Sequence, residues 1–235
     1  MIWRSVICFS LGLAVVHAGT VSGEVELTNS KDLAVRKRKD YSGVVIWLEP
    51  VDRAAPAAPP VRVKMLQKEK HFVPHVTAVS VGSAVDFPNL DPIFHNAFSN
   101  FSGQPFDLGL YAPGTSKLQT FRHPGIVRVF CNIHSAMSAI IAVLPTPWYT
   151  LTQVTGKYTL ADVPPGEYQM RLFHERALPE NLKFLERRIT VPEAGLAMPL
   201  ISISETGYIA APHLNKMGKE YPPVANDGTY PGAQK

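Results

Sequence analysis

A short stretch of the chain, residues 127–137, carries side chains that bind metals. It reads VRVFCNIHSAM, so Cys131, His134 and Met137 follow one another in a C-x2-H-x2-M pattern. A thiolate, an imidazole and a thioether suit a copper ion that cycles between two oxidation states. Such a site takes a second imidazole, and the earlier segment DPIFHN supplies His95 as the best candidate. We therefore expect two histidines and the cysteine in one plane around copper, with the methionine as a weak axial ligand.

The residues before the cysteine predict the strand that positions it. Val127, Val129 and Cys131 alternate with polar or bulky neighbours, so all three share one face of an extended chain. The apolar run 139–144 predicts a second strand after the loop. A lone cysteine in this context is more often an inert buried thiol, and only its coincidence with the other three residues favours a metal ligand.

The rest of the chain also has the pattern of β-structure. Alternating residues predict strands over 21–27 and 44–48, and a hairpin over 79–87 with a turn at Gly82-Ser83. The basic segment 31–40 between the first two strands predicts a solvated loop; a docking patch for an acidic partner is the alternative. No long amphipathic helix is expected.

Residues 79–143 resemble the cupredoxins. VDFPN precedes His95 and Asn96, and PGIVRVFCNIHSAM carries the other candidate ligands at a spacing similar to that of amicyanin. This resemblance implies a Greek-key β-barrel holding one type 1 copper ion on His95, Cys131, His134 and Met137. It also implies that Asn96 tethers the ligand loop near the sulfur.

A second resemblance concerns the flanks of this unit. The segment 156–170, GKYTLADVPPGEYQM, is similar to the second half of carboxypeptidase-regulatory-like, transthyretin-type sandwiches, and strands like 21–27 and 44–48 open such modules. We therefore expect an all-β chain, with a cupredoxin Greek-key β-barrel inserted in or adjacent to a small β-sandwich. The expected segments are a signal peptide (1–18), the first part of the sandwich with its linker (19–60), the cupredoxin domain (61–145), the second part of the sandwich (146–205) and a loose C-terminal tail (206–235).

The N-terminus predicts export. Residues 1–18 combine one basic residue, Arg4, with an apolar core and Val-His-Ala before Gly19, which is typical of a secretory signal peptide too short to span a bilayer. Cleavage after Ala18 would remove Cys8 and leave Cys131 as the lone thiol. We expect a periplasmic or otherwise exported protein with no membrane span.

These features together predict an electron-transfer carrier. We expect a monomer that meets redox partner proteins transiently, and the mild net charge of +4 calls for no nucleic acid. The alternatives are a copper storage or delivery protein, and a β-sandwich binding module in which copper is secondary. The chain has no His-x-His or His-Cys-His copper motif, no Ser-His-Asp order and no phosphate loop, so we predict that it is not an enzyme.

Overall fold

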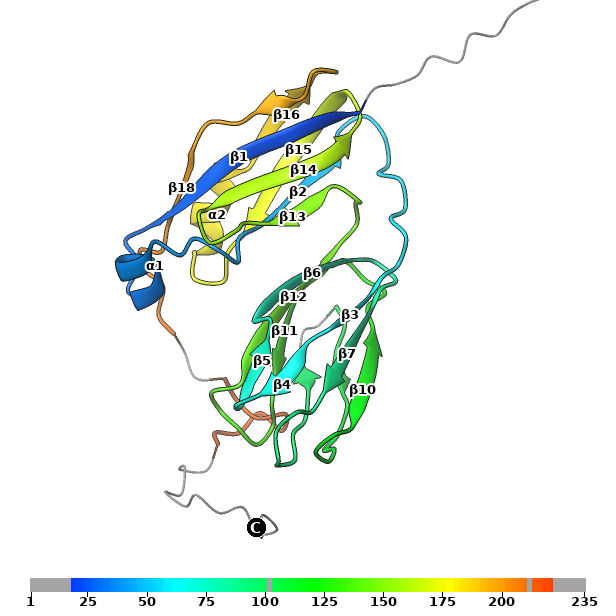
Figure 1. Cartoon of the computed structure of the whole chain (residues 1–235), viewed down its shortest axis with the longest axis vertical. Coiled ribbons are helices and arrows are strands. Elements are labelled where there is room, and N and C mark those ends of the chain that lie inside the picture. Colours follow the sequence, from blue (N-terminus) through cyan, green and yellow to red (C-terminus); the bar gives the residue numbers. More distant parts are fainter. Residues whose placement is uncertain (1–17, 101–102, 211–212, 222–235) are drawn as a thin grey trace, which may run out of the picture.

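The computed structural model describes residues 18–100, 103–210 and 213–221. Strands make up most of its regular structure, which confirms the all-β class. Figure 1 shows two β-sandwiches stacked along the long axis of the molecule. We call them the central sandwich, formed by the strands between Arg62 and Leu144, and the outer sandwich, formed by the strands on either side of that range.

The outer sandwich joins strands that precede and follow the central one in the sequence. One sheet has the order β14-β1-β17, with β18 also paired to β1, and the other has the order β13-β2-β15-β16. The bounds are β1 Gly19–Thr28, β2 Val45–Pro50, β13 Tyr149–Leu151, β14 Lys157–Val163, β15 Gly166–Phe173, β16 Arg187–Val191, β17 Leu196–Ala197 and β18 Ile201–Ser204. Antiparallel pairing sets Val21 opposite Leu160 and Leu48 opposite Met170, so segments from both ends of the chain share each sheet.

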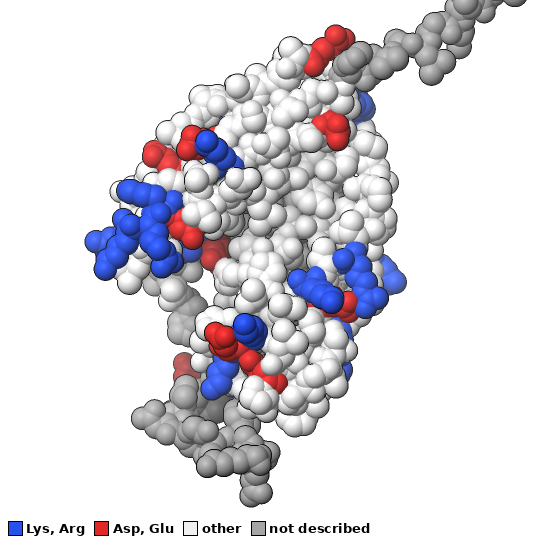
Figure 2. Space-filling view, in the orientation of Figure 1, with Lys and Arg blue, Asp and Glu red and all other residues white. Residues whose placement is uncertain are grey.

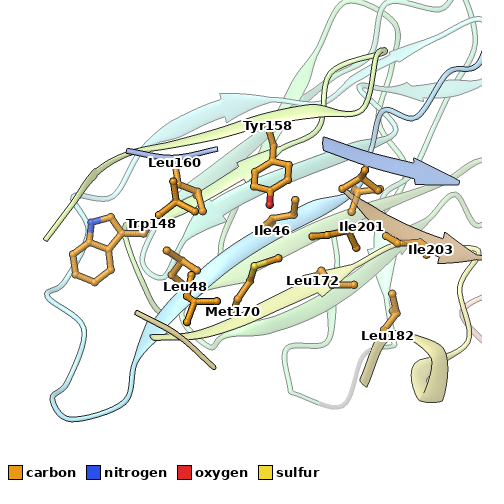
Figure 3. Packing of buried hydrophobic residues seen from close by; sticks show 14 of the residues in the cluster. Ile46, Leu48, Trp148, Tyr158, Leu160, Met170, Leu172, Leu182, Ile201 and Ile203 are labelled. Atoms are coloured by element: carbon orange, nitrogen blue, oxygen red, sulfur yellow. The ribbon is translucent and has the colours of Figure 1, made fainter. Parts of the chain in front are cut away.

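Alternating apolar side chains of the two sheets meet in one core. Figure 3 shows Ile46, Leu48 and Met170 from one sheet pointing toward Leu160 and Ile201 from the other. All are almost fully buried. This alternation explains why the flanking segments form strands, because every second residue has a core to face.

Two short helices lie in connections between strands of the outer sandwich. Helix α1 (Leu33–Arg38) begins after Asp32, whose carboxylate accepts a hydrogen bond from the Ala34 N–H at 2.6 Å, and it buries Val35. The prediction of a plain loop over 31–40 was therefore wrong, because an N-cap and one apolar anchor suffice for a short helix. Its basic residues stay exposed and form the blue group over α1 in Figure 2. Helix α2 (Pro179–Leu185) carries a proline in its first turn, where no backbone donor is required.

The central sandwich consists of two sheets, with a small ribbon beside them. The sheets have the orders β10-β7-β3 and β6-β12-β11-β8-β9, and the ribbon is β4-β5. The bounds are β3 Arg62–Lys64, β4 Leu66–Lys68, β5 His71–Val73, β6 Val76–Ser80, β7 Ala84–Pro88, β8 Phe98–Ser99, β9 Phe106–Asp107, β10 Ser116–Thr120, β11 Gly125–Phe130 and β12 Ser138–Leu144. Over the described residues these sheets are open, and they do not close into one hydrogen-bonded barrel.

The turn at Gly82 links the two sheets and does not close a hairpin. Strand β6 pairs in parallel with β12, whereas β7 pairs with β10 and β3. Val79 and Val85 are both fully buried in the same core, which they reach from opposite sheets. The predicted hairpin over 79–87 was wrong, because a tight turn between apolar strands serves a corner as well as a hairpin.

The predicted signal peptide lies outside the described residues, apart from Ala18. Among the residues that the structure describes, no helix is both long and apolar enough to cross a membrane.

Candidate metal centre

The loop between β11 and β12 carries the candidate ligands. The two strands pair antiparallel from Gly125 opposite Val143 to Phe130 opposite Ser138, so residues 131–137 form the connecting loop. Backbone hydrogen bonds close it: the Cys131 N–H donates to the Met137 carbonyl at 3.2 Å, and the Met137 N–H donates to the His134 carbonyl at 3.0 Å. The predicted strand, loop and strand are thus present, with Cys131 fully buried at the end of β11.

A separate segment brings His95 to this loop. The backbone of His95 pairs with that of Tyr111, with N···O distances of 3.2 and 2.9 Å in the two directions. The Cys131 Sγ lies 3.9 Å from His95 Nδ1 and 3.5 Å from His134 Nδ1, and the two Nδ1 atoms are 3.2 Å apart. The structure therefore brings together three of the four predicted ligands, with His95 coming from a segment far from Cys131 and His134 in the sequence.

These separations fit a single metal ion. Metal–nitrogen and metal–sulfur bonds of about 2.0 and 2.3 Å around one ion place the ligand atoms roughly 3.3–3.8 Å from one another. The observed distances among His95, Cys131 and His134 bracket that range. One thiolate and two imidazoles also make a donor set that suits copper.

Asp91 fixes which nitrogen of His95 faces the sulfur. Its Oδ2 lies 2.7 Å from His95 Nε2, and its two oxygens accept hydrogen bonds from the backbone N–H groups of Glu69 and Lys70 at 2.6 and 2.9 Å. An Nε2–H that donates to this carboxylate leaves the Nδ1 lone pair pointing at the candidate site. Such a carboxylate behind a ligand histidine commonly orients the ring and raises its basicity.

Both histidines are held in the neutral form that binds metals. Burial lowers the pKa of His95, although its contact with Asp91 works in the opposite direction. Burial and the neighbouring His95 lower the pKa of His134 to about 4. At neutral pH both rings therefore offer a lone pair.

The thiol of Cys131 is buried in its protonated form. Burial raises its pKa, which backbone N–H groups of Ile133, Asn96 and His134 partly oppose. A thiolate ligand has to lose its proton, so metal binding at this site releases one.

Met137 and Asn96 lie beside the three-ligand group. Met137 is fully buried in the core of the central sandwich, and its backbone helps to close the ligand loop; an axial role for its sulfur stays a prediction. The Asn96 side chain accepts a hydrogen bond from the Asn132 N–H at 3.2 Å, so it does contact the ligand loop.

No role in the site was predicted for Asp91, for Asp107 or for any tail residue. Asp91 stands four residues before His95, and that spacing was the one available signal. The tail residues Lys216 and Tyr221 also contact the loop, at Asn132 and Cys131. Contacts across so much sequence leave no periodic pattern to detect.

No known protein family and no curated protein matches the chain by sequence. Similar solved structures include cupredoxins. A purple cupredoxin from Nitrosopumilus maritimus matches with 21% identity over 32% of this chain and 84% of its own, at a TM-score of 0.30. Amicyanin from Paracoccus versutus matches with 17% identity over 45% of this chain and 99% of its own, at a TM-score of 0.34. These TM-scores are low, so we base the assignment of the site on its own donor atoms.

A third match corrects one prediction. A Cu-containing nitrite reductase from Thermus scotoductus SA-01 is 26% identical over 51% of this chain and 28% of its own, at a TM-score of 0.35. The prediction that the chain is not an enzyme was therefore wrong, because an enzyme is among the proteins of similar structure. The absence of one short motif, His-x-His, was not sufficient to exclude an enzyme.

Proposed function

We propose that the protein binds one type 1 copper ion through His95, Cys131, His134 and Met137 and acts in electron transfer. The observation that carries the proposal is the convergence of the Cys131 sulfur and the two Nδ1 atoms within 3.2–3.9 Å of one another. Copper held by such ligands supplies one-electron oxidation and reduction. The chain's own part is to orient the donors, keep both histidines neutral and exclude water.

The burial of the donors supports electron transfer over storage or delivery of copper. His95, Cys131 and Met137 have no exposed surface, and the loop that holds two of them is closed by backbone hydrogen bonds. Rigid, buried ligands keep one geometry in both oxidation states. A protein that delivers copper needs ligands that open to solvent, and only His134 of the set is partly exposed.

We propose that transient redox partners dock where His134 reaches the surface. Ala136 is exposed in the ligand loop, and Leu90 and Phe94, which flank Asp91 and His95, are 55% and 52% exposed. Small and apolar side chains suit a weak, short-lived interface. We propose a monomer in solution.

For the rest of the chain we propose an exported protein. Residues 19–60 and 146–205 would form one β-sandwich module around a copper domain at 61–145, after removal of a signal peptide at 1–18 and before a C-terminal tail at 206–235. The pairing of β1 with β14 and of β2 with β15 supports this division.

The electron self-exchange rate of the copper-loaded protein tests the function. We expect Ala136→Glu to slow self-exchange at least tenfold with little change in copper affinity, because it places like charges between two docking copies. Ala161→Glu is the matched control, since Ala161 is an exposed alanine in the outer sandwich and should leave the rate unchanged. NMR line broadening on mixtures of oxidised and reduced protein measures the rate. Negligible self-exchange in the wild type, with copper stripped by a chelator within minutes, would refute electron transfer in favour of delivery.

A further inference from the structure

A segment of the tail, residues 213–221, returns from the outer sandwich to the metal loop. The chain leaves β18 at Ser204, and Figure 1 shows this orange-red segment at the far end of the central sandwich. The His213 ring stacks on Phe130, with ring centroids 4.1 Å apart and planes inclined by 24°. Phe130 directly precedes Cys131, so the segment lies against the point where β11 becomes the ligand loop.

The same segment makes two hydrogen bonds to the ligand loop. The Tyr221 hydroxyl donates to the Cys131 carbonyl at 2.7 Å, and the Lys216 N–H donates to the Asn132 side-chain oxygen at 2.9 Å. The Tyr221 ring also meets the edge of His213, with centroids 5.1 Å apart. The contacts therefore reach the backbone of the cysteine ligand itself.

These contacts close a ring of hydrogen bonds beside the metal site. Its members are Asn132 N–H to Asn96 Oδ1 at 3.2 Å, Asn96 Nδ2 to Asp107 Oδ1 at 2.7 Å, Lys216 Nζ to Asp107 Oδ2 at 2.6 Å, and Lys216 N–H to Asn132 Oδ1 at 2.9 Å. The ring connects the ligand loop, the residue after His95, strand β9 and the tail. Two segments that supply ligands are thus tied to each other through Asp107 and Lys216.

We propose that Tyr221 and Lys216 are positioning residues of the metal centre, supplied by the C-terminal tail. The inference deepens the proposed function and rests on it. Groups that hydrogen-bond to ligands and to their loops set the orientation of the ligands and the properties of the metal. In this protein the tail holds the Cys131 carbonyl and the Asn132 amide, so it sets both the geometry of the sulfur and its shielding from solvent.

The first test uses the metal-free, full-length protein and measures the alkylation rate of Cys131 by iodoacetamide. Mass spectrometry of the peptide that carries Cys131 separates it from Cys8. We expect Tyr221→Phe and Lys216→Ala each to raise the rate about fivefold, which corresponds to the loss of one hydrogen bond. Lys216→Arg, which keeps a cation for Asp107, should restore the wild-type rate. Tyr208→Phe, a tail tyrosine outside residues 213–221, is the matched control and should have no effect.

The second test uses the same variants loaded with copper(II) and reads the thiolate absorption bands and the copper hyperfine splitting. We expect Tyr221→Phe to shift both, because it frees the Cys131 carbonyl, whereas Tyr208→Phe should not. Wild-type alkylation rates and spectra in Tyr221→Phe and Lys216→Ala would overturn the proposal, as would equal effects of all variants including Tyr208→Phe. The alkylation test needs no metal, so failure of the chain to bind copper would refute the proposed function and leave this result standing.

Discussion

His95 uses one ring nitrogen for a carboxylate and leaves the other for a metal. Asp91 holds Nε2 at 2.7 Å and is itself fixed by two backbone N–H groups. Burial would raise the pKa of Asp91, but the hydrogen bonds from Lys70, His95 and Glu69 outweigh it and lower that pKa. A fully ionised carboxylate thus faces a neutral imidazole, which fixes the tautomer of His95.

Removing the charge of Asp91 should weaken the metal site. We expect Asp91→Asn to lower copper affinity by about ten- to a hundredfold, because an amide no longer fixes the tautomer of His95 or raises its basicity. Competition with a copper(I) chelator measures the affinity. Asp86→Asn is the matched control, since Asp86 is a buried aspartate of the same sandwich that pairs with Arg62. Equal affinities for wild type and Asp91→Asn would show that Asp91 does not orient the ligand.

The alternation of apolar residues made the strands that flank the ligand loop predictable. Side-chain contacts between segments far apart in the sequence could not be predicted. Val127, Val129 and Cys131 share a buried face because that side of β11 faces the core of the central sandwich. The turn at Gly82 was wrongly predicted to close a hairpin, because the hydrogen-bonding partners of β6 and β7 depend on the sheets that they join and not on the turn between them. The Tyr221 contact lay beyond prediction, because the tail has no periodicity and its partner is ninety positions away.

A buried carboxylate and its hydrogen-bond donors join the ends of strands in the outer sandwich. Glu205, just after β18, accepts hydrogen bonds from His174 Nε2 at 3.0 Å, Arg176 Nε at 3.1 Å and the Ser30 hydroxyl at 2.7 Å. Burial alone would raise the pKa of Glu205, but these hydrogen bonds outweigh it and lower the pKa to about 2. The ionised form is therefore the one that stabilises the fold.

The stability of the protein should fall in acid because Glu205 is protonated there. A folded-state pKa of about 2 against an ordinary value of 4.5 means that its stabilisation is present above pH 4.5 and lost between pH 4.5 and 2. The shift corresponds to roughly 3 kcal/mol of the free energy of unfolding. Urea unfolding from pH 7 to 2 should show a large gap between wild type and Glu205→Gln that closes toward pH 2. The exposed Glu24→Gln is the control, and a gap independent of pH would contradict this account.

The two sandwiches pack through strands that are buried on both faces. In β12, Ile141 and Val143 face the central core, while Ala142 and Leu144 contact Val45 of β2 in the outer sandwich. This two-sided burial explains the unbroken apolar runs in both strands. An ion pair between His75 and Glu175, 2.7 Å apart, links the sandwiches at the edge of the same interface.

A charge in this interface should destabilise the whole molecule. We expect Ala142→Asp to lower the free energy of unfolding by about 3 to 5 kcal/mol, because it buries a carboxylate without a partner. Differential scanning calorimetry should show the loss. Ala161→Asp places the same charge on an exposed strand position and should change little. Similar melting of both variants would mean that the sandwiches do not depend on this contact.

The visible absorption spectrum of the full-length protein after addition of copper(II) tests the central claim most directly. With the Cys131 sulfur within 3.9 Å of both histidine Nδ1 atoms, we predict an intense blue or green colour from thiolate-to-copper charge transfer. Cys131→Ala should bind copper without that band, and one equivalent of copper should saturate the wild-type signal. A wild-type protein that binds copper and stays colourless, or a Cys131→Ala variant that keeps the colour, would contradict the assignment.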